Sequence, residues 1–318
     1  MGRKLTSSIG LAGLLALMAL VVGCGGGRSA TGATGSEVNR VLTGALTGQA
    51  DLPEALTGKI AFTGNRDGDT AIYVMHADGS NQTKLNSNGE SPTWSPNGRR
   101  IAFDGNPEGN YEIYVMNADG TGQANLTNNS SYDVEPAWSP NGSRIAFTST
   151  RADLGTYDLY TMRTDGSRVR RLTHDPVCAN DAAWSPDGTR IAFSSGRSGG
   201  VDIYVMNADG SGPTRLTTTR AYDYAPAWSP DGTRIAFTST RAGNQEIYVM
   251  NADGSGQTRL TRNPGYDDQA AWSPDGARIV FASYRHATPG LFVMNADGTG
   301  RRRLTPGQDW APAWWGPR

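Results

Sequence analysis

The sequence is poor in cysteine and histidine, which limits the chemistry that its side chains could carry. Its 318 residues include 2 cysteines, Cys24 and Cys178, and 3 histidines, His76, His174 and His286. Two cysteines provide no disulfide framework of the kind found in small secreted domains. The three histidines fall at different places in the pattern described below, so they assemble neither a catalytic triad nor a histidine metal site.

Long apolar runs and an excess of basic residues are missing from most of the chain. No stretch after residue 23 is apolar enough to span a bilayer. Without Arg3 and Lys4 the net charge is −3, because 27 basic residues then oppose 30 acidic ones, and this gives no reason to expect nucleic acid as a partner. A content of 37% hydrophobic residues with 41 glycines favours a soluble β-rich protein over a bundle of long helices.

The first 23 residues have the order of an export signal. Arg3 and Lys4 precede an apolar run from Ile9 to Val22, and Gly23-Cys24 follows. The stretch "VVGC" resembles the bacterial lipobox, and this resemblance implies cleavage before Cys24 and lipidation of its thiol. The alternative is an ordinary signal peptide with an incidental cysteine. If Cys24 is lipidated, Cys178 is alone, and we expect it to be a packing residue.

Residues 24–58 are predicted to form a tether between the lipid and a folded domain. The stretch is rich in glycine, threonine and other small residues and has little periodic apolar signal. The folded domain is predicted to cover residues 59–318.

Four short sequence elements recur six times in that domain. Tryptophans stand at 94, 138, 184, 228, 272 and 314, which are 44, 46, 44, 44 and 42 residues apart. An "IAF"-type run, an "IYVM"-type run and an "RLT"-type run follow in a fixed order within each repeat. A period of this length with four short strands is typical of a propeller blade. The turns "SPDG" and "ADGS" between the runs suit tight hairpins, because proline and glycine supply the required backbone angles.

The ends of the repeat region predict how the ring closes. The first "IAF" run begins at Ile60 with no Trp-Ser-Pro before it, and the last "PAWW" (312–315) has no "IAF" after it. Six blades are complete only if the C-terminal segment supplies the inner strand of the first blade. We therefore predict an all-β, six-bladed propeller of four-stranded antiparallel blades, closed by its C-terminal strand.

The pattern W-S-P-D-G, I-A-F, I-Y-V-M and R-L-T resembles the TolB-like propeller, a WD40-like bacterial repeat, over residues 59–315. The resemblance implies a monomeric binding propeller in the cell envelope. TolB proper also carries an N-terminal α/β domain and is a soluble periplasmic partner of the peptidoglycan-associated lipoprotein. Here a tether of about 35 residues precedes the blades, so the resemblance does not transfer the role in the Tol system.

The connections into the tryptophan strands vary between repeats and carry the candidate binding residues. In a propeller they lie on one face around the central channel, a region that we call the channel mouth. They hold nine acidic residues, opposed only by Arg220 and Arg262. Such an acidic, aromatic surface suits an extended peptide, a basic ligand or a cation-assisted ligand. The predicted partner-binding residues are Tyr132, Asp133, Glu135, Asp181, Tyr222, Asp223, Tyr266, Asp267, Asp268, Asp309 and Trp310.

Other interpretations of the same residues remain open. Asp133, Asp223, Asp267 and Asp309 each stand five residues before their tryptophan, and they could instead cap the strand or hold its turn. No cofactor is required, although the oxygen ligands at the mouth would suit Ca²⁺. Arginines at 66, 151, 197, 241 and 285 and carboxylates at 112, 158, 202 and 246 are expected to form local ion pairs with one another.

Catalysis has less support in the sequence. "GRSGG" (196–200) fits G-x-S-x-G, but a nucleophile elbow needs a strand, a sharp turn and a helix, whereas Ser198 falls in a hairpin loop. We therefore expect no catalytic residues and a non-catalytic, lipid-anchored envelope protein that binds a protein or ligand. The alternatives are a hydrolase or lyase built on a propeller, or a calcium-dependent binding protein.

Overall fold

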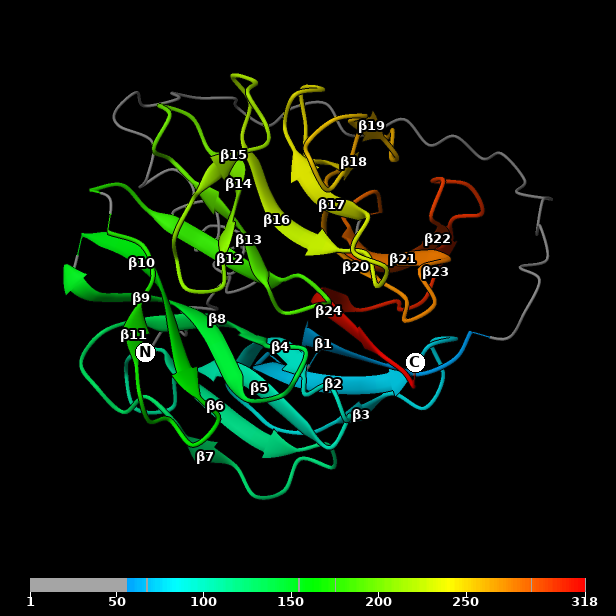
Figure 1. The fold of residues 1–318 in the computed structure, drawn as a ribbon. Coiled ribbons are helices and arrows are strands. Elements are labelled where there is room, and N and C mark those ends of the chain that lie inside the picture. Colours follow the sequence, from blue (N-terminus) through cyan, green and yellow to red (C-terminus); the bar gives the residue numbers. More distant parts are fainter. Residues whose placement is uncertain (1–55, 67, 154, 175, 287, 318) are drawn as a thin grey trace, which may run out of the picture.

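The computed structural model describes residues 56–317 except 67, 154, 175 and 287. The predicted signal peptide, Cys24 and most of the predicted tether lie outside these residues. The described chain folds into six four-stranded antiparallel sheets, which surround a common centre (Figure 1). The predicted six-bladed, all-β propeller is confirmed.

Each blade begins at the centre with the strand that carries the repeat tryptophan. These inner strands are β4 (Gly89–Trp94), β8 (Asp133–Trp138), β12 (Ala179–Trp184), β16 (Asp223–Trp228), β20 (Asp267–Trp272) and β24 (Gln308–Trp315). The "IAF" runs form the second strands, β1 (Lys59–Asn65), β5 (Arg100–Gly105), β9 (Arg144–Asp153), β13 (Arg190–Ser195), β17 (Arg234–Ser239) and β21 (Arg278–Ser283).

The two outer strands of each blade follow from the "IYVM" and "RLT" runs. The third strands are β2 (Thr70–His76), β6 (Glu112–Asn117), β10 (Thr156–Arg163), β14 (Asp202–Asn207), β18 (Glu246–Asn251) and β22 (Gly290–Asn295). The outermost strands have two residues each: β3 (Thr83–Lys84), β7 (Ala124–Asn125), β11 (Arg170–Arg171), β15 (Thr214–Arg215), β19 (Thr258–Arg259) and β23 (Arg302–Arg303). Such short edges offer little backbone for pairing with other chains.

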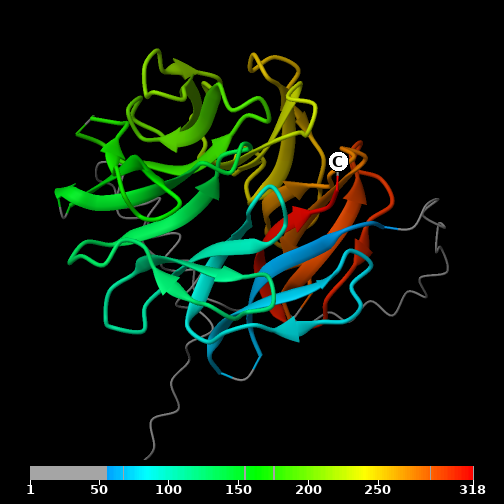
Figure 2. The same ribbon diagram turned by 60° about the horizontal axis from the view of Figure 1, so that its bottom comes forward.

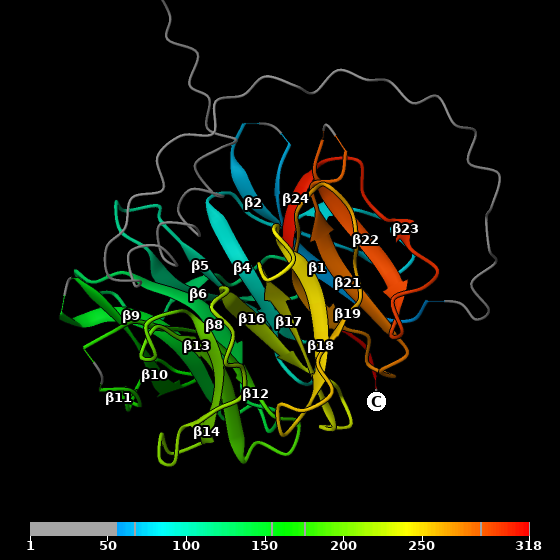
Figure 3. The ribbon, with the colours of Figure 1, turned by 90° about the horizontal axis from the view of Figure 1, so that it is seen from above.

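The C-terminal strand closes the ring as predicted. β24 pairs antiparallel with β1, from Ile60 opposite Trp314 to Asn65 opposite Gln308. Figure 2 shows the red C-terminal strand beside the blue N-terminal strand. Blade 1 therefore consists of β24, β1, β2 and β3, and blades 2 to 6 follow in chain order around the ring (Figure 3).

The Ser-Pro-Asp-Gly turns are fixed by their own side chains. In blade 5 the Ser229 hydroxyl accepts the Arg234 N–H at 2.9 Å and donates to the Asp231 carboxylate at 2.5 Å. Gly232 has φ +71°, which a residue with a Cβ rarely adopts. The turn thus sets the register between β16 and β17, where Trp228 lies opposite Ile235.

Apolar side chains from adjacent blades form the core. The phenylalanine of each "IAF" run is fully buried, as for Phe237. It lies against the aromatic ring of the third strand; the Phe237 and Tyr248 ring centroids are 5.7 Å apart. The repeat tryptophans, such as Trp228 and Trp272, pack between neighbouring blades. Burial of aromatic rings at every junction stabilises the ring of blades.

A β-bulge in every inner strand shapes the central channel. In β16 the pairing with β17 shifts between Tyr224 and Ala227. The third residue of each inner strand in blades 2 to 6, and Ala311 in β24, has positive φ, between 48° and 57°. This kink places the residue at the channel and brings its N–H against the preceding blade.

Candidate functional site: the channel mouth and central channel

The four aspartates that stand five residues before their tryptophan, called the ring aspartates below, are buried and paired with arginine. Asp133, Asp223, Asp267 and Asp309 stand at equivalent positions near the start of their inner strands, and each is 0% exposed. Their Oδ2 atoms lie 2.7 to 2.8 Å from the Nη2 atoms of Arg151, Arg241, Arg285 and Arg66, respectively. The expectation that these carboxylates lack matching bases is wrong. Arg151 lies in the second strand of its blade, and the other three arginines lie one or two residues after the end of the second strand; the strand pairing brings each of them beside its aspartate.

Each of these arginines also packs on the aromatic core. The Arg241 guanidinium carbon lies 4.8 Å from the centre of the Tyr248 ring and 5.3 Å from that of Phe237. Stacking on rings and pairing with a carboxylate both suit the planar guanidinium. The pair therefore joins the mouth loops to the core.

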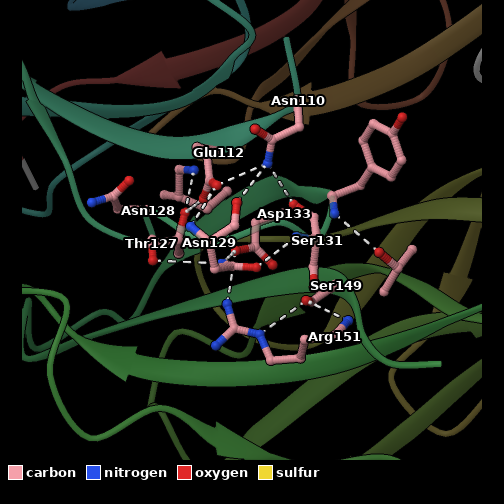
Figure 4. Close-up of polar contacts among 12 residues, drawn as sticks. Asn110, Glu112, Thr127, Asn128, Asn129, Ser131, Asp133, Ser149 and Arg151 are labelled. Atoms are coloured by element: carbon pink, nitrogen blue, oxygen red, sulfur yellow. Dashed lines mark hydrogen bonds and ion pairs between the residues drawn. The ribbon is translucent and has the colours of Figure 1, made fainter. Parts of the chain in front are cut away.

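In blade 3 the pair belongs to a larger polar network, shown in Figure 4. Asp133 accepts from Arg151 and from the Asn129 side-chain amide at 2.6 Å. The Asn129 N–H donates to the buried Glu112 carboxylate at 2.7 Å, and the Asn110 amide donates to Glu112 at 2.8 Å. The connection into β8 is thereby held between blades 2 and 3.

A second set of buried carboxylates pairs with the outermost strands. Asp158, Asp202 and Glu246 at the third strands bind Arg171, Arg215 and Arg259, at 2.6 to 2.8 Å. The expected pairing of these carboxylates with the loop arginines is therefore wrong. These three carboxylates and the loop arginines at 66, 151, 241 and 285 all form ion pairs, but with other partners. Blade 2 has Asn125 where blades 3 to 6 place an arginine, and Glu112 instead accepts from the Thr127 hydroxyl.

Inside the mouth the channel contains a cavity of about 190 Å³. Two residues from each of the six inner strands line it: Ser91, Pro92, Glu135, Pro136, Asp181, Ala182, Ala225, Pro226, Gln269, Ala270, Ala311 and Pro312. Among the predicted site residues, Glu135 and Asp181 therefore reach the channel itself. Asp268 lies behind the lining, where it accepts from the Thr238 hydroxyl at 2.8 Å and the Tyr224 hydroxyl at 3.2 Å.

Five acidic groups around the cavity have raised pKa values. Burial, reinforced by Asp181, raises the pKa of Glu135 well above its usual range. Burial also raises the pKa of Asp181. Burial raises the pKa of Asp104 and of Asp268 to about 6 each. Burial and the nearby Asp104 raise the pKa of Glu90 to about 7. Within the described residues, none of these five carboxyls forms an ion pair with a basic side chain.

Three of the predicted aromatics are exposed at the mouth. Tyr132, Tyr222 and Tyr266 precede the ring aspartates of blades 3, 5 and 6, and their exposed fractions are 44%, 38% and 40%. Among the described residues, the other large hydrophobic side chain with comparable exposure is Val169. The fourth predicted aromatic, Trp310, is half-buried and packs against the core of blade 1.

Sequence reasoning missed several residues of the channel. Asp104 of the "IAFD" run in blade 2 replaces the threonine or serine found in blades 1, 3, 4 and 5. Its carboxylate accepts the Glu135 N–H at 3.0 Å. Tyr111 donates its hydroxyl to Glu90 at 3.3 Å. The departure of Asp104 from the repeat was a signal that could have been used, whereas the bulge that brings it to the channel was not visible in the sequence.

The catalytic and metal alternatives gain no support from the geometry. The Ser198 hydroxyl donates to Asp202 at 2.5 Å, and Asp202 is bound by Arg215, so the pair contains no general base for a nucleophile. Within the described part of the chain, no group of three or more histidine, cysteine, aspartate or glutamate side chains is placed to hold a metal ion. The described residues also contain no helix with the length and apolar character needed to cross a membrane.

Comparisons with known structures agree with this architecture. TolB from Acinetobacter baumannii is 23% identical, with a TM-score of 0.71, and the match covers 82% of this chain and 67% of that one. A putative TolB from Agrobacterium tumefaciens is 21% identical, with a TM-score of 0.66 over 83% of this chain and 100% of that one. An oligogalacturonate lyase from Vibrio parahaemolyticus shares 13% identity, with a TM-score of 0.53 over 77% of this chain and 74% of that one. These likenesses show the fold.

The sequence itself identifies the family. No curated protein matches the chain significantly. In contrast, the TolB beta propeller domain family matches residues 85–175, 152–224 and 219–318, which together span well over half of the chain. Those stretches contain the tryptophan turns and the strand runs from which the blades are built. The chain therefore belongs to the TolB beta propeller domain family.

Proposed function

We propose that this chain is a cell-envelope lipoprotein whose propeller binds a protein partner at the channel mouth without catalysing a reaction. The observation that carries the proposal is the exposure of Tyr132, Tyr222 and Tyr266 at one repeat position in three blades. Tyrosine offers a large contact area with a polar tip, and it is enriched in protein interfaces. Exposed aromatic side chains at the same position of three blades are best explained by a partner.

The shape and chemistry of the channel suit an extended segment with a basic side chain. The three tyrosines lie on the connections into their inner strands, and Glu135 and Asp181 of the inner strands line the cavity. A cation entering the cavity would meet carboxyl groups that have no basic partner of their own. We infer that the tyrosines supply most of the contact area and the two carboxyls select for positive charge.

The ring aspartates take a different part in this proposal. Asp133, Asp223, Asp267 and Asp309 are fully buried beneath arginine, so they are out of reach of a partner. We infer that they hold the tyrosine-bearing loops in place through Arg151, Arg241 and Arg285. They are positioning residues, in agreement with the interpretation that they fix their own strand and turn.

Site-specific photo-crosslinking tests the proposed surface. The full chain is expressed in bacteria with an intact cell envelope, with a photoreactive phenylalanine analogue at position 132, 222 or 266. The same partner should be captured from all three positions. The matched control carries the analogue at Val169, which is exposed to a similar degree on the outer part of blade 3. The tyrosine surface is contradicted if positions 132, 222 and 266 capture nothing, or if position 169 captures the same product.

The location in the envelope is supported by the charged, apolar and small-residue order of residues 1–24 and by membership of the TolB beta propeller domain family. Ser198 has no general base in its pair with Asp202, and the described residues hold no group of three or more metal-binding side chains, so neither feature favours the hydrolase or the calcium alternative.

A further inference from the structure

The kinked residues of the inner strands link all six blades through hydrogen bonds around the channel. In each case the residue has positive φ, and its backbone N–H donates to a side chain of the preceding blade. The six bonds are Ser91 N–H to Thr63 Oγ1 at 3.0 Å, Glu135 N–H to Asp104 Oδ1 at 3.0 Å, Asp181 N–H to Glu135 Oε2 at 3.1 Å, Ala225 N–H to Asp181 Oδ2 at 3.3 Å, Gln269 N–H to Thr238 Oγ1 at 3.3 Å, and Ala311 N–H to Gln269 Oε1 at 2.9 Å.

The acceptors divide this ring into two chemically different halves. At the three consecutive junctions from blade 2 to blade 5 the acceptor is a carboxyl group, of Asp104, Glu135 or Asp181. At the other three junctions the inter-blade acceptor is a hydroxyl or an amide oxygen, which keeps the same charge at every physiological pH. The Gln269 N–H also donates to the Asp268 carboxylate of its own blade at 2.7 Å. The inter-blade acceptors can therefore change their charge at three junctions and keep it at the other three.

The groups that face the three carboxyls are themselves acidic or phenolic. Asp104 is near Glu90 and Glu135, Glu135 is near Asp181, and Asp181 is near Asp268. The nearby phenols are Tyr111, Tyr157 and Tyr224. Hydroxyl donors from Thr148 and Ser194 complete the surroundings of Glu135 and Asp181. Ionisation thus places several negative charges close together with no neutralising base.

We propose that Asp104, Glu135 and Asp181 make this half of the ring a pH-dependent lock between blades 2 and 5. In their neutral forms they accept the inter-blade N–H groups and hold the junctions closed. As the pH rises they lose their protons to the solvent. A carboxylate accepts an N–H more strongly than a neutral carboxyl does, but repulsion among several buried negative charges outweighs this gain. Glu135 and Asp181 then turn into the water of the channel, where their charge is hydrated, and release the amides of Asp181 and Ala225.

The sign of the effect follows from the direction of the pKa shifts. A carboxyl whose pKa is raised on folding stabilises the folded state most below its ordinary pKa of about 4, and this advantage is lost as the pH rises through the raised value. For this cluster the loss begins above about pH 4 and extends through about pH 6 for Asp104. Aspartates in the exposed turns, such as Asp187, have lowered pKa values and change their charge below that pH window.

Hydrogen exchange in the unmodified full-length protein tests the lock directly, with the neutral junction at Ala311 as the internal control. Between about pH 5 and about pH 8, protection factors corrected for intrinsic exchange should fall roughly tenfold or more for the amides of Glu135, Asp181 and Ala225. The amide of Ala311, which donates to Gln269 Oε1, should change less than about twofold. An equal change at Ala311, or greater protection of the carboxyl-bonded amides at high pH, would overturn the proposal.

Substitutions provide a second measurement. Glu135→Gln copies the arrangement of Gln269 in blade 6, and combined with Asp181→Asn it removes two ionisable acceptors while keeping their shape. The melting temperature of the unmodified protein should fall by roughly 5 °C between about pH 5 and about pH 8, and the double variant should lose at least half of this fall. The control, Asp275→Asn, lies in an exposed turn where blades 2 and 3 already have asparagine, and it should keep the full fall. An unmodified protein whose melting temperature is constant or rises over this range contradicts the lock.

Discussion

A buried carboxylate that is paired with arginine responds to substitution differently from a buried carboxyl that has no basic partner. Both kinds lie within a few residues of each other at the start of the inner strands. Asp223 and Arg241 form the first kind, and Glu135 with Asp181 the second. Loss of the charge leaves a guanidinium without its partner in the first kind, whereas in the second it removes a source of repulsion.

Substitution of Asp223 should therefore lower the stability of the fold, and any loss of partner binding should follow from that loss of stability. Asp223→Asn keeps the shape but removes the charge opposite Arg241, which is 18% exposed. We expect a loss of about 2–4 kcal/mol in the free energy of unfolding, measured by urea denaturation, because breaking a largely buried ion pair leaves one charge uncompensated. Asp231→Asn is the control. It changes an exposed turn position that is Asn97 and Asn141 in two other blades, and it should cost less than about 0.5 kcal/mol. Equal midpoints for the two variants would contradict a structural role for the pair.

The residue types at the mouth were predictable from the repeat, but their pairing was not. The spacing of five residues before each tryptophan correctly placed the four aspartates at equivalent positions. Asp223 lies opposite Ser239 across the strands, so Arg241, two residues further on, reaches it. This pairing follows only when the register across the bulge is known. For Asp309 the partner Arg66 is 243 residues away in the chain, and only the closure of the ring brings the two together.

Among the secondary-structure elements, β24 has the largest consequence for the whole ring. It completes blade 1, and it also contacts the neighbouring blades, since Trp314 and Trp310 pack on the core of blades 1 and 6, and the Trp315 ring lies 5.9 Å from that of Trp94 in blade 2. Removal of this strand would expose the side chains of blades 1, 2 and 6 that it covers, together with the unpaired edge of β1.

Deletion of residues 310–318 should therefore open the ring. We expect a loss of more than about 5 kcal/mol in the free energy of unfolding, because the strand pairing and several partly buried tryptophans are lost together. Thermal unfolding followed by tryptophan fluorescence measures the effect. Deletion of residues 317–318 alone leaves β24 intact and should preserve the melting temperature within about 2 °C. If the longer deletion melts at the same temperature as the full chain, β24 does not close the ring.

The strand order was predictable because each element is repeated six times. A single "IAF" run is too short to assign with certainty, but six copies at one period leave one consistent architecture. The bulges and the positive φ values were not predictable, since serine, glutamate, aspartate, alanine and glutamine all occupy the kinked position. The constraint at that position comes from the neighbouring blade and not from the residue itself.

For the molecule as a whole, the predicted lipid anchor is the feature that decides where the propeller works. Cys24→Ser should move the protein from the membrane fraction to the soluble exported fraction, or leave it with an uncleaved signal, because the acyl chains of a lipoprotein cysteine provide stable attachment. Fractionation and mass measurement of the mature N-terminus check this. Membrane association that is unchanged in the variant and resists high salt would contradict lipidation at Cys24.

The pairing of β1 with β24 also has a consequence for biosynthesis. In blade 1, β24 comes from the C-terminal end of the folded domain and β1, β2 and β3 come from its N-terminal end. A chain that leaves the ribosome N-terminus first therefore carries the unpaired edge of β1 until β24 has been made. Contacts between such distant residues form late in folding, since the intervening chain must first be ordered. Five blades can assemble beforehand, but the ring cannot close until β24 is available. In the export route that we propose, a chain still passing through the membrane would therefore lack a closed ring, and the propeller would close only after β24 has crossed.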